Sequence, residues 1–189
     1  MDANDMEYRK ALLGQIKDAY GRVESTYTTH WKQRDIYFGR SKKIKCCEII
    51  LSSISTTGLV GFLISEKWWV ALVGTIFSAI SLSLTLYTKD ANYEDLVRAH
   101  RKSADDLWPL REKYISLMTD FDSLPTSEIV KNRDELGEMT SKIYENAPTT
   151  SPKAFSLTKK ALNIGNGAFL SESELESITP LFLRKSKNG

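Results

Sequence analysis

Hydroxyl side chains recur inside two segments that are otherwise apolar, at a spacing that places them on one face of a helix. In the first segment, Ser52, Ser55 and Thr56 continue a stripe that begins at Glu48. In the second, small and polar residues step by three and four along one face, at Ala71, Gly74, Ser78, Ser81 and Thr85. One such stripe serves to pack two membrane helices together. The other is then free to line a water-filled path, with Glu48 at its mouth.

The two stripes are competing candidates for a pore lining. The first segment also carries Ser53, Thr57 and Gly61 at four-residue steps, which suits close helix contact. Serine and threonine can also bond their own backbone in lipid, and both stripes would then only pack the helices.

Basic side chains are the second group that can do chemistry, because arginine and lysine bind phosphate. The candidates are Arg22, Arg34, Arg111, Arg133, Lys153, Lys159 and Lys160. Tyrosine or tryptophan stacked on a base would add ~1–3 kcal/mol each. Taken singly, each cation is interpreted as a solvated surface charge, and the net charge of +2 does not by itself indicate nucleic-acid binding. The basic and aromatic residues between positions 27 and 43 also suit a membrane-surface anchor.

Catalytic motifs are missing from the sequence. It contains no Gly-rich phosphate loop, nucleophile elbow or zinc-protease helix. His30 and His100 are its only histidines, with no cysteine beside them, so we expect no zinc site and interpret both as core-edge or interfacial residues. We expect no enzyme activity and no cofactor.

The elements that position the hydroxyl stripes are two apolar segments, 46–64 and 68–87, joined by Ser65-Glu66-Lys67. At 1.5 Å per residue each spans a hydrocarbon core of about 30 Å. Glu48 lies near the start of the first, where a charge costs much less than the ~2.5–3.5 kcal/mol at a bilayer centre. The short connector predicts an antiparallel transmembrane hairpin. The alternative is a buried hairpin in a soluble α-helical protein.

Basic residues flank the two segments on the side away from the connector. They are Arg34, Arg40, Lys42, Lys43 and Lys45 before the first, and Lys89, Arg98, Arg101 and Lys102 after the second. The connector offers Lys67 alone, so the positive-inside rule predicts that both termini are cytoplasmic. We therefore expect an all-α membrane protein with a cytosolic amphipathic helix at 1–43, a hairpin at 44–88 and a cytosolic helical region at 89–189.

Helix signals extend on both sides of the hairpin. Residues 6–43 form an amphipathic pattern that can continue into the first span, and a second such pattern follows Tyr87 to about Phe121. Pro109 predicts a kink or a restart of this second helix. Shorter helices are expected from Thr126 to about Tyr144, after the cap Ser151-Pro152, and at Ser171 with Glu174, which have capping-box spacing.

The chain resembles the SLATT family, the two-span effector proteins of bacterial conflict systems. The segments that carry the resemblance are Tyr20-Gly21-Arg22, Leu107-Trp108, 110–120, 131–136, Ile143-Tyr144, Ala147-Pro148 and Lys153-Ala154-Phe155. The resemblance implies an effector of the bacterial inner membrane, encoded beside a nucleotidyltransferase or a reverse transcriptase and used in abortive anti-phage defence.

These observations together predict an oligomeric ion channel gated by a nucleotide or short oligonucleotide. Two helices cannot enclose a pore, so at least about four subunits must assemble in the lipid. The alternative function is a non-conducting, membrane-anchored adaptor that recruits a cytosolic partner. A membrane enzyme is a third possibility, for which the sequence offers no residues.

Overall fold

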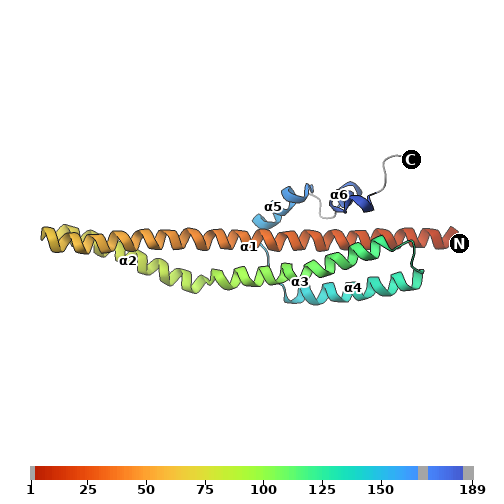
Figure 1. Ribbon diagram of the computed structural model, residues 1–189, viewed down its shortest axis with the longest axis horizontal. Helices are drawn as coiled ribbons and strands as arrows, with labels where there is room; N and C mark the ends of the chain where they lie inside the picture. Colours follow the sequence, from red (N-terminus) through yellow and green to blue (C-terminus); the bar gives the residue numbers. More distant parts are fainter. Residues whose placement is uncertain (1–2, 166–169, 185–189) are drawn as a thin grey trace. The chain divides into compact units, whose positions relative to one another are not determined.

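The computed structural model describes residues 3–165 and 170–184, and every regular element in that part of the chain is helical. In chain order the elements are α1 (Ala3–Ser65), α2 (Trp68–Ala91), α3 (Tyr93–Thr119), α4 (Thr126–Asn146), α5 (Pro152–Leu162), α6 (Glu172–Ile178) and the 3-10 helix η1 (Leu181–Leu183). Figure 1 labels the six α-helices. The expectation of an all-α fold is confirmed for the described residues.

The first helix is continuous from the amphipathic pattern into the first apolar segment. α1 has 63 residues and contains no proline, so no backbone donor is lost along it. After it comes Glu66, a non-glycine residue with φ of 56°, and α2 begins at Trp68. The first predicted apolar segment, 46–64, thus lies within α1, and the second, 68–87, lies within α2.

Of the two effects predicted for Pro109, a kink or a restart of the second amphipathic helix, the restart is wrong. α3 passes through Pro109 without interruption. Pro109 and Asp105 are both exposed, so water can bond the carbonyl group that proline leaves without a donor. On either side, Leu107 and Leu110 are buried and hold the helix in place.

The real break in this part of the chain is at Asn92, between α2 and α3. Its backbone is left-handed, with φ of 40° and ψ of 50°, and its N–H donates to the carbonyl oxygen of Thr88 at 3.1 Å. Asparagine tolerates this conformation better than most residues with a side chain. A helix end at Asn92 was not predicted from the sequence.

The caps predicted for the last helices are confirmed. Ser151 Oγ accepts a hydrogen bond of 3.3 Å from the N–H of Ala154, and Pro152 opens α5. At α6, Ser171 Oγ accepts from the N–H of Glu174, and Glu174 Oε2 accepts from the N–H of Ser171 at 2.6 Å. This is the reciprocal pair of a capping box.

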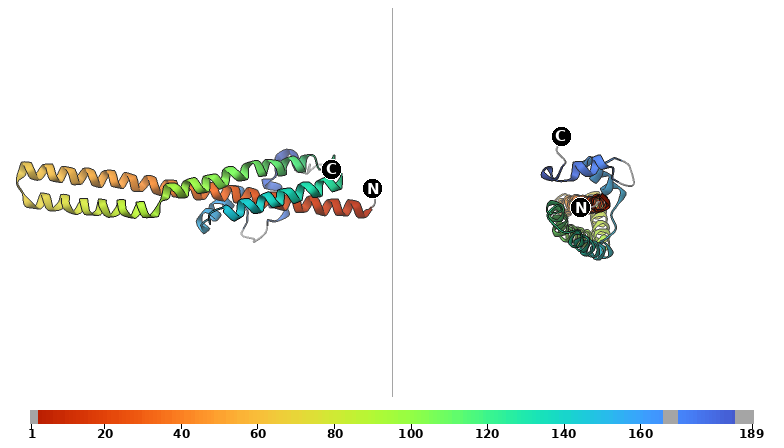
Figure 2. Two further views of the ribbon diagram at one scale, coloured as in Figure 1. Left: turned by 90° about the horizontal axis from the view of Figure 1, so that it is seen from below. Right: turned by 90° about the vertical axis from the view of Figure 1, so that its right-hand side faces the viewer.

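The helices form two compact units. Unit 1 consists of residues 1–33 and 99–189, and unit 2 of residues 34–98. Within unit 1, α1, α3 and α4 share an apolar core, and Figure 2 shows these helices running side by side. The buried core residues are Leu12, Ile16, Tyr20, Val23, Leu107, Leu110, Tyr114, Leu117, Met118, Phe121, Ile129 and Leu136.

The helices α5 and α6 cover a different face of α1 within unit 1 (Figure 1). Tyr20 Oη donates to the carbonyl oxygen of Ile178 at 3.2 Å. A Cβ added at Gly21 would lie 2.5 Å from a methyl carbon of Leu175, so glycine at this position permits the close approach of α6.

Unit 2 has the opposite distribution of apolar side chains. Leu63, Ile64 and Trp68 are 76%, 81% and 72% exposed. Two helices in the described part of the chain are long and apolar enough to cross a membrane, and only 6% of the most apolar window of each is buried. Such surfaces favour hydrocarbon over water as their surroundings.

Candidate functional site

Glycine brings α1 and α2 into close contact within unit 2. A Cβ added at Gly58 would lie 2.9 Å from the Cα of Gly74, closer than side chains normally approach. Ser55 is buried at the same crossing, and its Oγ donates a hydrogen bond of 3.1 Å to the carbonyl oxygen of Gly74. Small residues are what permits two membrane helices to approach this closely. Ser55, Gly58 and Gly74 therefore form the packing contact between the two apolar helices.

An open polar groove of about 820 Å³ lies along α1 and α2, and we call it the span groove. Its lining consists of Lys45, Glu48, Ile49, Ser52, Ser53, Thr56, Thr57, Ser81 and Thr85. The Oγ atoms of Ser52 and Ser81 lie 3.3 Å apart and join the two helices. Near one end, Thr88 Oγ1 donates to Glu48 Oε1 at 3.3 Å. All the lining residues except Ile49 are polar, whereas the rest of the surface of the apolar segments 46–64 and 68–87 is mainly apolar.

The hydroxyl protons of the span groove are mostly directed back to the helix backbone. Ser53 and Thr57 donate to the carbonyl oxygens of Ile49 and Ser53, both within 2.9 Å. Thr56 and Thr85 do the same with Ser52 and Ser81, at 2.9 and 3.0 Å. A hydroxyl that donates still has acceptor lone pairs. The groove can therefore offer oxygen acceptors to water or to a cation.

The residues predicted to line a pore fall into three places in the structure. Ser55 and Gly74 lie in the packing contact. Glu48, Ser52, Thr56, Ser81 and Thr85 line the span groove. Ser78 is exposed and is not among the residues that line the groove.

Sequence reasoning missed Lys45, Ile49, Ser53 and Thr57 as lining residues. It placed Ser53 and Thr57 on a packing stripe, but both are exposed, and the close contact uses Gly58 instead. A signal was available in the sequence. Residues 49, 53 and 57 lie next to residues 48, 52 and 56 on one helix face, so both rows could have been predicted to line the same groove.

Arg111 is engaged inside unit 1 with two carboxylates. It pairs with Glu24 of α1 and with its neighbour Glu112, and its guanidinium lies 5.1 Å from the ring centre of Trp108. The phenol of Tyr20 lies next to this pair, and burial, with Glu24 second, raises the pKa of Tyr20 to about 12. Arg111 thus joins α3 to α1 within the bundle.

Arg22 and Arg133 are brought together by the fold. They line one groove of about 560 Å³ between α1, α3 and α4, which we call the bundle groove. The other lining residues are Gln15, Ala19, Tyr114, Asp134, Gly137, Glu138, Thr140, Ser141 and Tyr144. Arg22 pairs with Asp18, and Arg133 pairs with Asp134 at 2.7 Å and donates to Gln15 Oε1 at 3.0 Å. An anion in this groove would compete with these exposed carboxylates.

The remaining predicted phosphate ligands do not share the bundle groove. Arg34 belongs to unit 2, where it pairs with Asp35 at 2.8 Å and lies over the ring of Phe38. Lys153 and Lys160 are exposed on α5, and Lys159 Nζ lies 4.7 Å from the ring centre of Phe155.

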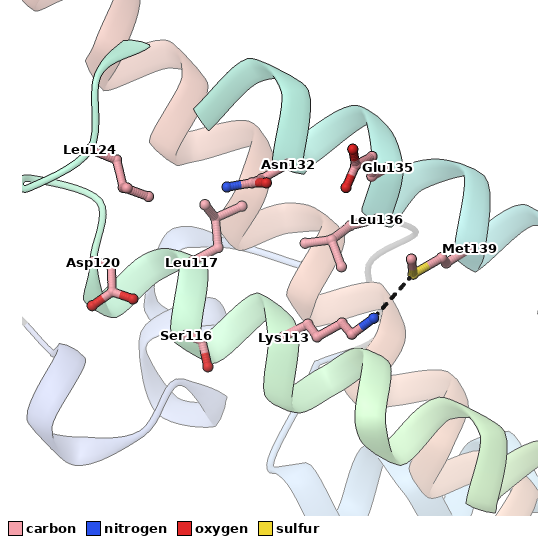
Figure 3. Close-up of a pocket in the computed structure, with 9 residues that line it drawn as sticks. All are labelled: Lys113, Ser116, Leu117, Asp120, Leu124, Asn132, Glu135, Leu136 and Met139. Carbon is pink, nitrogen blue, oxygen red and sulfur yellow. Dashed lines mark hydrogen bonds between the residues drawn. The ribbon is translucent and has the colours of Figure 1, made fainter. Parts of the chain in front are cut away.

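A third cavity, of about 310 Å³, lies between α3 and α4. Figure 3 shows Leu117, Leu124 and Leu136 beside it, with Asp120 and Glu135 among the other lining residues. Lys113 is the single cation in its lining, and its Nζ donates to Met139 Sδ at 3.6 Å. Two carboxylates against one ammonium group suit a phosphate poorly.

Among residues 3–165 and 170–184, no group of three or more histidine, cysteine, aspartate or glutamate side chains is placed to hold a metal ion. Cys46 and Cys47 are exposed free thiols.

Comparison with known proteins gives one assignment. No curated protein and no solved structure matches the chain. Residues 12–174, which include both apolar helices and most of unit 1, match the model of SLATT_4, described as the SMODS and SLOG-associating 2TM effector domain family 4. The resemblance noted in the sequence is thus confirmed, and the chain belongs to this family of two-transmembrane effector domains.

Proposed function

We propose that the protein is an oligomeric ion channel of the bacterial inner membrane, gated by a nucleotide or short oligonucleotide and used in abortive anti-phage defence. In this proposal residues 44–88 form an antiparallel transmembrane hairpin. Residues 1–43 and 89–189 lie in the cytoplasm, as the basic flanks of the spans favour. The ligand is made by a partner nucleotidyltransferase or reverse transcriptase.

The observation that carries the proposal is the span groove. A polar strip along helices that otherwise expose Leu63, Ile64 and Ile80 is unfavourable against lipid tails. Assembly of at least about four copies with this strip turned inward would remove it from lipid and enclose water. We assign the lining to Glu48, Ser52, Thr56, Ser81 and Thr85. Ser55 and Gly74 are excluded from it because they pack the helices.

The channel is tested by recording currents across planar bilayers that contain the purified protein. Ser52→Leu should abolish or strongly reduce the current, because leucine fills the groove. Ser83→Leu is the matched control, since Ser83 is also exposed, donates to its own backbone and is not among the lining residues. Glu48→Gln should reduce selectivity for cations. If Ser52→Leu and Ser83→Leu conduct equally, the groove is not the pore.

One observation favours the non-conducting adaptor. The hydroxyls of Ser53, Thr56, Thr57 and Thr85 are satisfied by their own helix and do not require water. A purified oligomer that never conducts, with or without the partner's products, would support the adaptor. A strict monomer in detergent, measured by light scattering, would exclude a channel.

For the ligand we propose the bundle groove. Arg22 and Arg133 supply two cations, and Tyr144, which is 38% exposed, supplies an aromatic ring in the same lining. Arginine pairs with phosphate through charge-assisted bonds, so binding should weaken as salt is raised.

The ligand is sought by purifying the protein with its genomic neighbour and identifying co-purifying nucleotides by mass spectrometry. Arg133→Ala should remove them, whereas Lys153→Ala, at an exposed position on α5, should retain them. Retention in Arg133→Ala and in Arg22→Ala would place the ligand elsewhere.

A further inference from the structure

The two histidines of the sequence, seventy positions apart, meet inside unit 1. His30 belongs to α1 and His100 to α3, and their side chains leave the residues only 2% and 1% exposed. Their Nδ1 atoms lie 3.0 Å apart and their ring centres 5.2 Å apart. At this separation one Nδ1 donates a hydrogen bond and the other accepts it.

The polar residues next to the two histidines along α1 and α3 pair with uncharged groups. On the α5 side, Thr158 Oγ1 is 3.0 Å from Thr29 Oγ1, and the N–H of Ser151 donates to Gln33 Oε1 at 2.9 Å. On α3, Ser103 Oγ donates to the carbonyl oxygen of Ala99 at 3.2 Å.

Of the charged residues that follow His30 on α1, Lys32 is partly exposed and Arg34 pairs with Asp35 at 2.8 Å. Arg101 and Lys102 of α3 are exposed, and Arg101 pairs with Asp105. Lys159 of α5 lies over Phe155.

Protonation opposes this packing, because both rings are buried and burial disfavours a charged imidazole. Burial, with the charge of His100 second, lowers the pKa of His30 from 6.5 to about 4. Burial also lowers the pKa of His100. When both imidazoles are charged, both Nδ1 atoms carry protons, so the hydrogen bond is lost and two cations face each other.

We propose that the His30–His100 pair is an acid-sensitive contact, which holds α1 against α3 while both rings are neutral and releases them as the surroundings acidify. α1 and α3 each continue as helices from these histidines into unit 2, so the contact lies where a change in packing can reach the apolar helices. A pore that admits protons would acidify the cytoplasm and loosen this contact further, an extension that rests on the proposed channel.

The direction of the pH effect follows from the lowered pKa values. The packed state is fully favoured above pH 6.5, the pKa of an unburied histidine, and loses stability as pH falls from there toward about 4. At pH 5.5, the loss from His30 alone corresponds to about a tenfold shift toward the unpacked state.

The test uses the full chain without a histidine tag in lipid nanodiscs. Because the sequence has two histidines, their imidazole NMR signals can be followed individually through a pH titration. Both midpoints should lie below 6.5, with His30 lowest. Hydrogen exchange of residues 26–33 and 99–104, corrected for intrinsic rates, should accelerate about tenfold between pH 7.5 and 5.5.

The variant His30→Asn/His100→Asn keeps an uncharged hydrogen-bonding group near each Nδ1 position, and its exchange should not depend on pH in this range. Thr158→Val is the matched control, because it removes a buried hydroxyl from the same region without removing a titrating group. It should speed exchange equally at both pH values. If the double variant does not fold, the wild-type titration decides alone. Midpoints at or above 6.5, or protection unchanged by pH, would overturn the proposal.

A separate measurement distinguishes failure of the proposed channel from failure of the acid-sensitive contact. Currents are recorded with the cytoplasmic side at pH 7.5 and at pH 5.5. Hydrogen exchange that depends on pH, without current, would support the acid-sensitive contact and reject the channel. Current with hydrogen exchange that does not depend on pH would support the channel and reject the acid-sensitive contact.

Discussion

The two units use the same long helix in opposite ways. In unit 1, α1 buries one stripe, Leu12, Ile16, Tyr20 and Val23, and leaves polar residues such as Lys10 and Arg22 exposed. In unit 2, α1 buries little more than Ser55 at its contact with α2, and exposes apolar residues such as Leu63 and Ile64. Along this one unbroken helix, the apolar side chains thus form a buried stripe in unit 1 and an exposed surface in unit 2.

The difference shows that burial inside the chain is not a measure of how well each unit is stabilised. Unit 1 gains from removing apolar surface from water, whereas lipid offers no such gain between apolar helices, whose contact depends on close fit. Substitutions of similar chemistry should therefore have different consequences in the two units.

The largest expected effect is in the core of unit 1. Leu107 is fully buried, so Leu107→Ala should reduce the free energy of unfolding by about 2–5 kcal/mol. Denaturant unfolding followed by circular dichroism measures this loss. Leu63→Ala, at a residue 76% exposed in unit 2, should leave the same transition almost unchanged. Equal losses would mean that the two units do not differ in this way.

A lysine introduced at two sites of similar exposure, one in each unit, should have different effects. Ile80 is 48% exposed near the middle of α2, and Tyr8 is 50% exposed in unit 1. Ile80→Lys should oppose membrane insertion by about 2.5–3.5 kcal/mol, while Tyr8→Lys should change stability by less than about 0.5 kcal/mol. The membrane-bound fraction after expression provides the measurement. Normal insertion of Ile80→Lys would argue that α2 does not face lipid.

An added side chain at the helix contact should have a smaller effect. Gly58→Val forces a Cβ against Gly74 and should cost about 1–3 kcal/mol of the packing between the two helices. Gly39→Val is the control, since a Cβ there meets nothing within 4 Å. Thermal unfolding in nanodiscs compares the two. If both variants lose the same stability, the close fit at Gly58 contributes nothing special.

The smallest expected effect is at the start of α6. Hydrogen bonds from the Ser171 hydroxyl, the Ser171 N–H and the Gly165 N–H lower the pKa of Glu174 from 4.5 to about 2. The stabilisation is therefore present above pH 4.5 and lost as pH falls toward about 2. Hydrogen exchange of residues 172–178 should rise over that range in the wild type. Glu174→Gln should remove the pH dependence, and its persistence there would assign it to another group.

Much of the helical architecture could be predicted from local signals. The length of the apolar segments defined the two long helices, and Ser151-Pro152 and Ser171 with Glu174 marked the starts of α5 and α6. Pro109 does not start a new helix, because its effect depends on whether water reaches the freed carbonyl group. Asn92 gave no warning, since a single asparagine adopts left-handed and helical backbones alike.

The candidate site was less predictable, because it depends on which residues meet across helices. The spacing of hydroxyls identified a polar face, but whether Ser55 or Ser53 meets α2 depends on the rotation of one helix against the other. Likewise, Arg22 and Arg133 are far apart in sequence and only the packing of α1 with α4 brings them to one groove. The meeting of His30 with His100 has the same origin.

The division of unit 1 into residues 1–33 and 99–189 has a consequence for biosynthesis. The ribosome completes the first part of α1 long before α3 and α4 exist, so the stripe of Leu12, Ile16 and Tyr20 has no core to join. Chains grow at about 5–20 residues per second, which leaves this stripe without its partners for several seconds while both apolar helices are made. The core of unit 1 can therefore form only after both apolar helices have been synthesised.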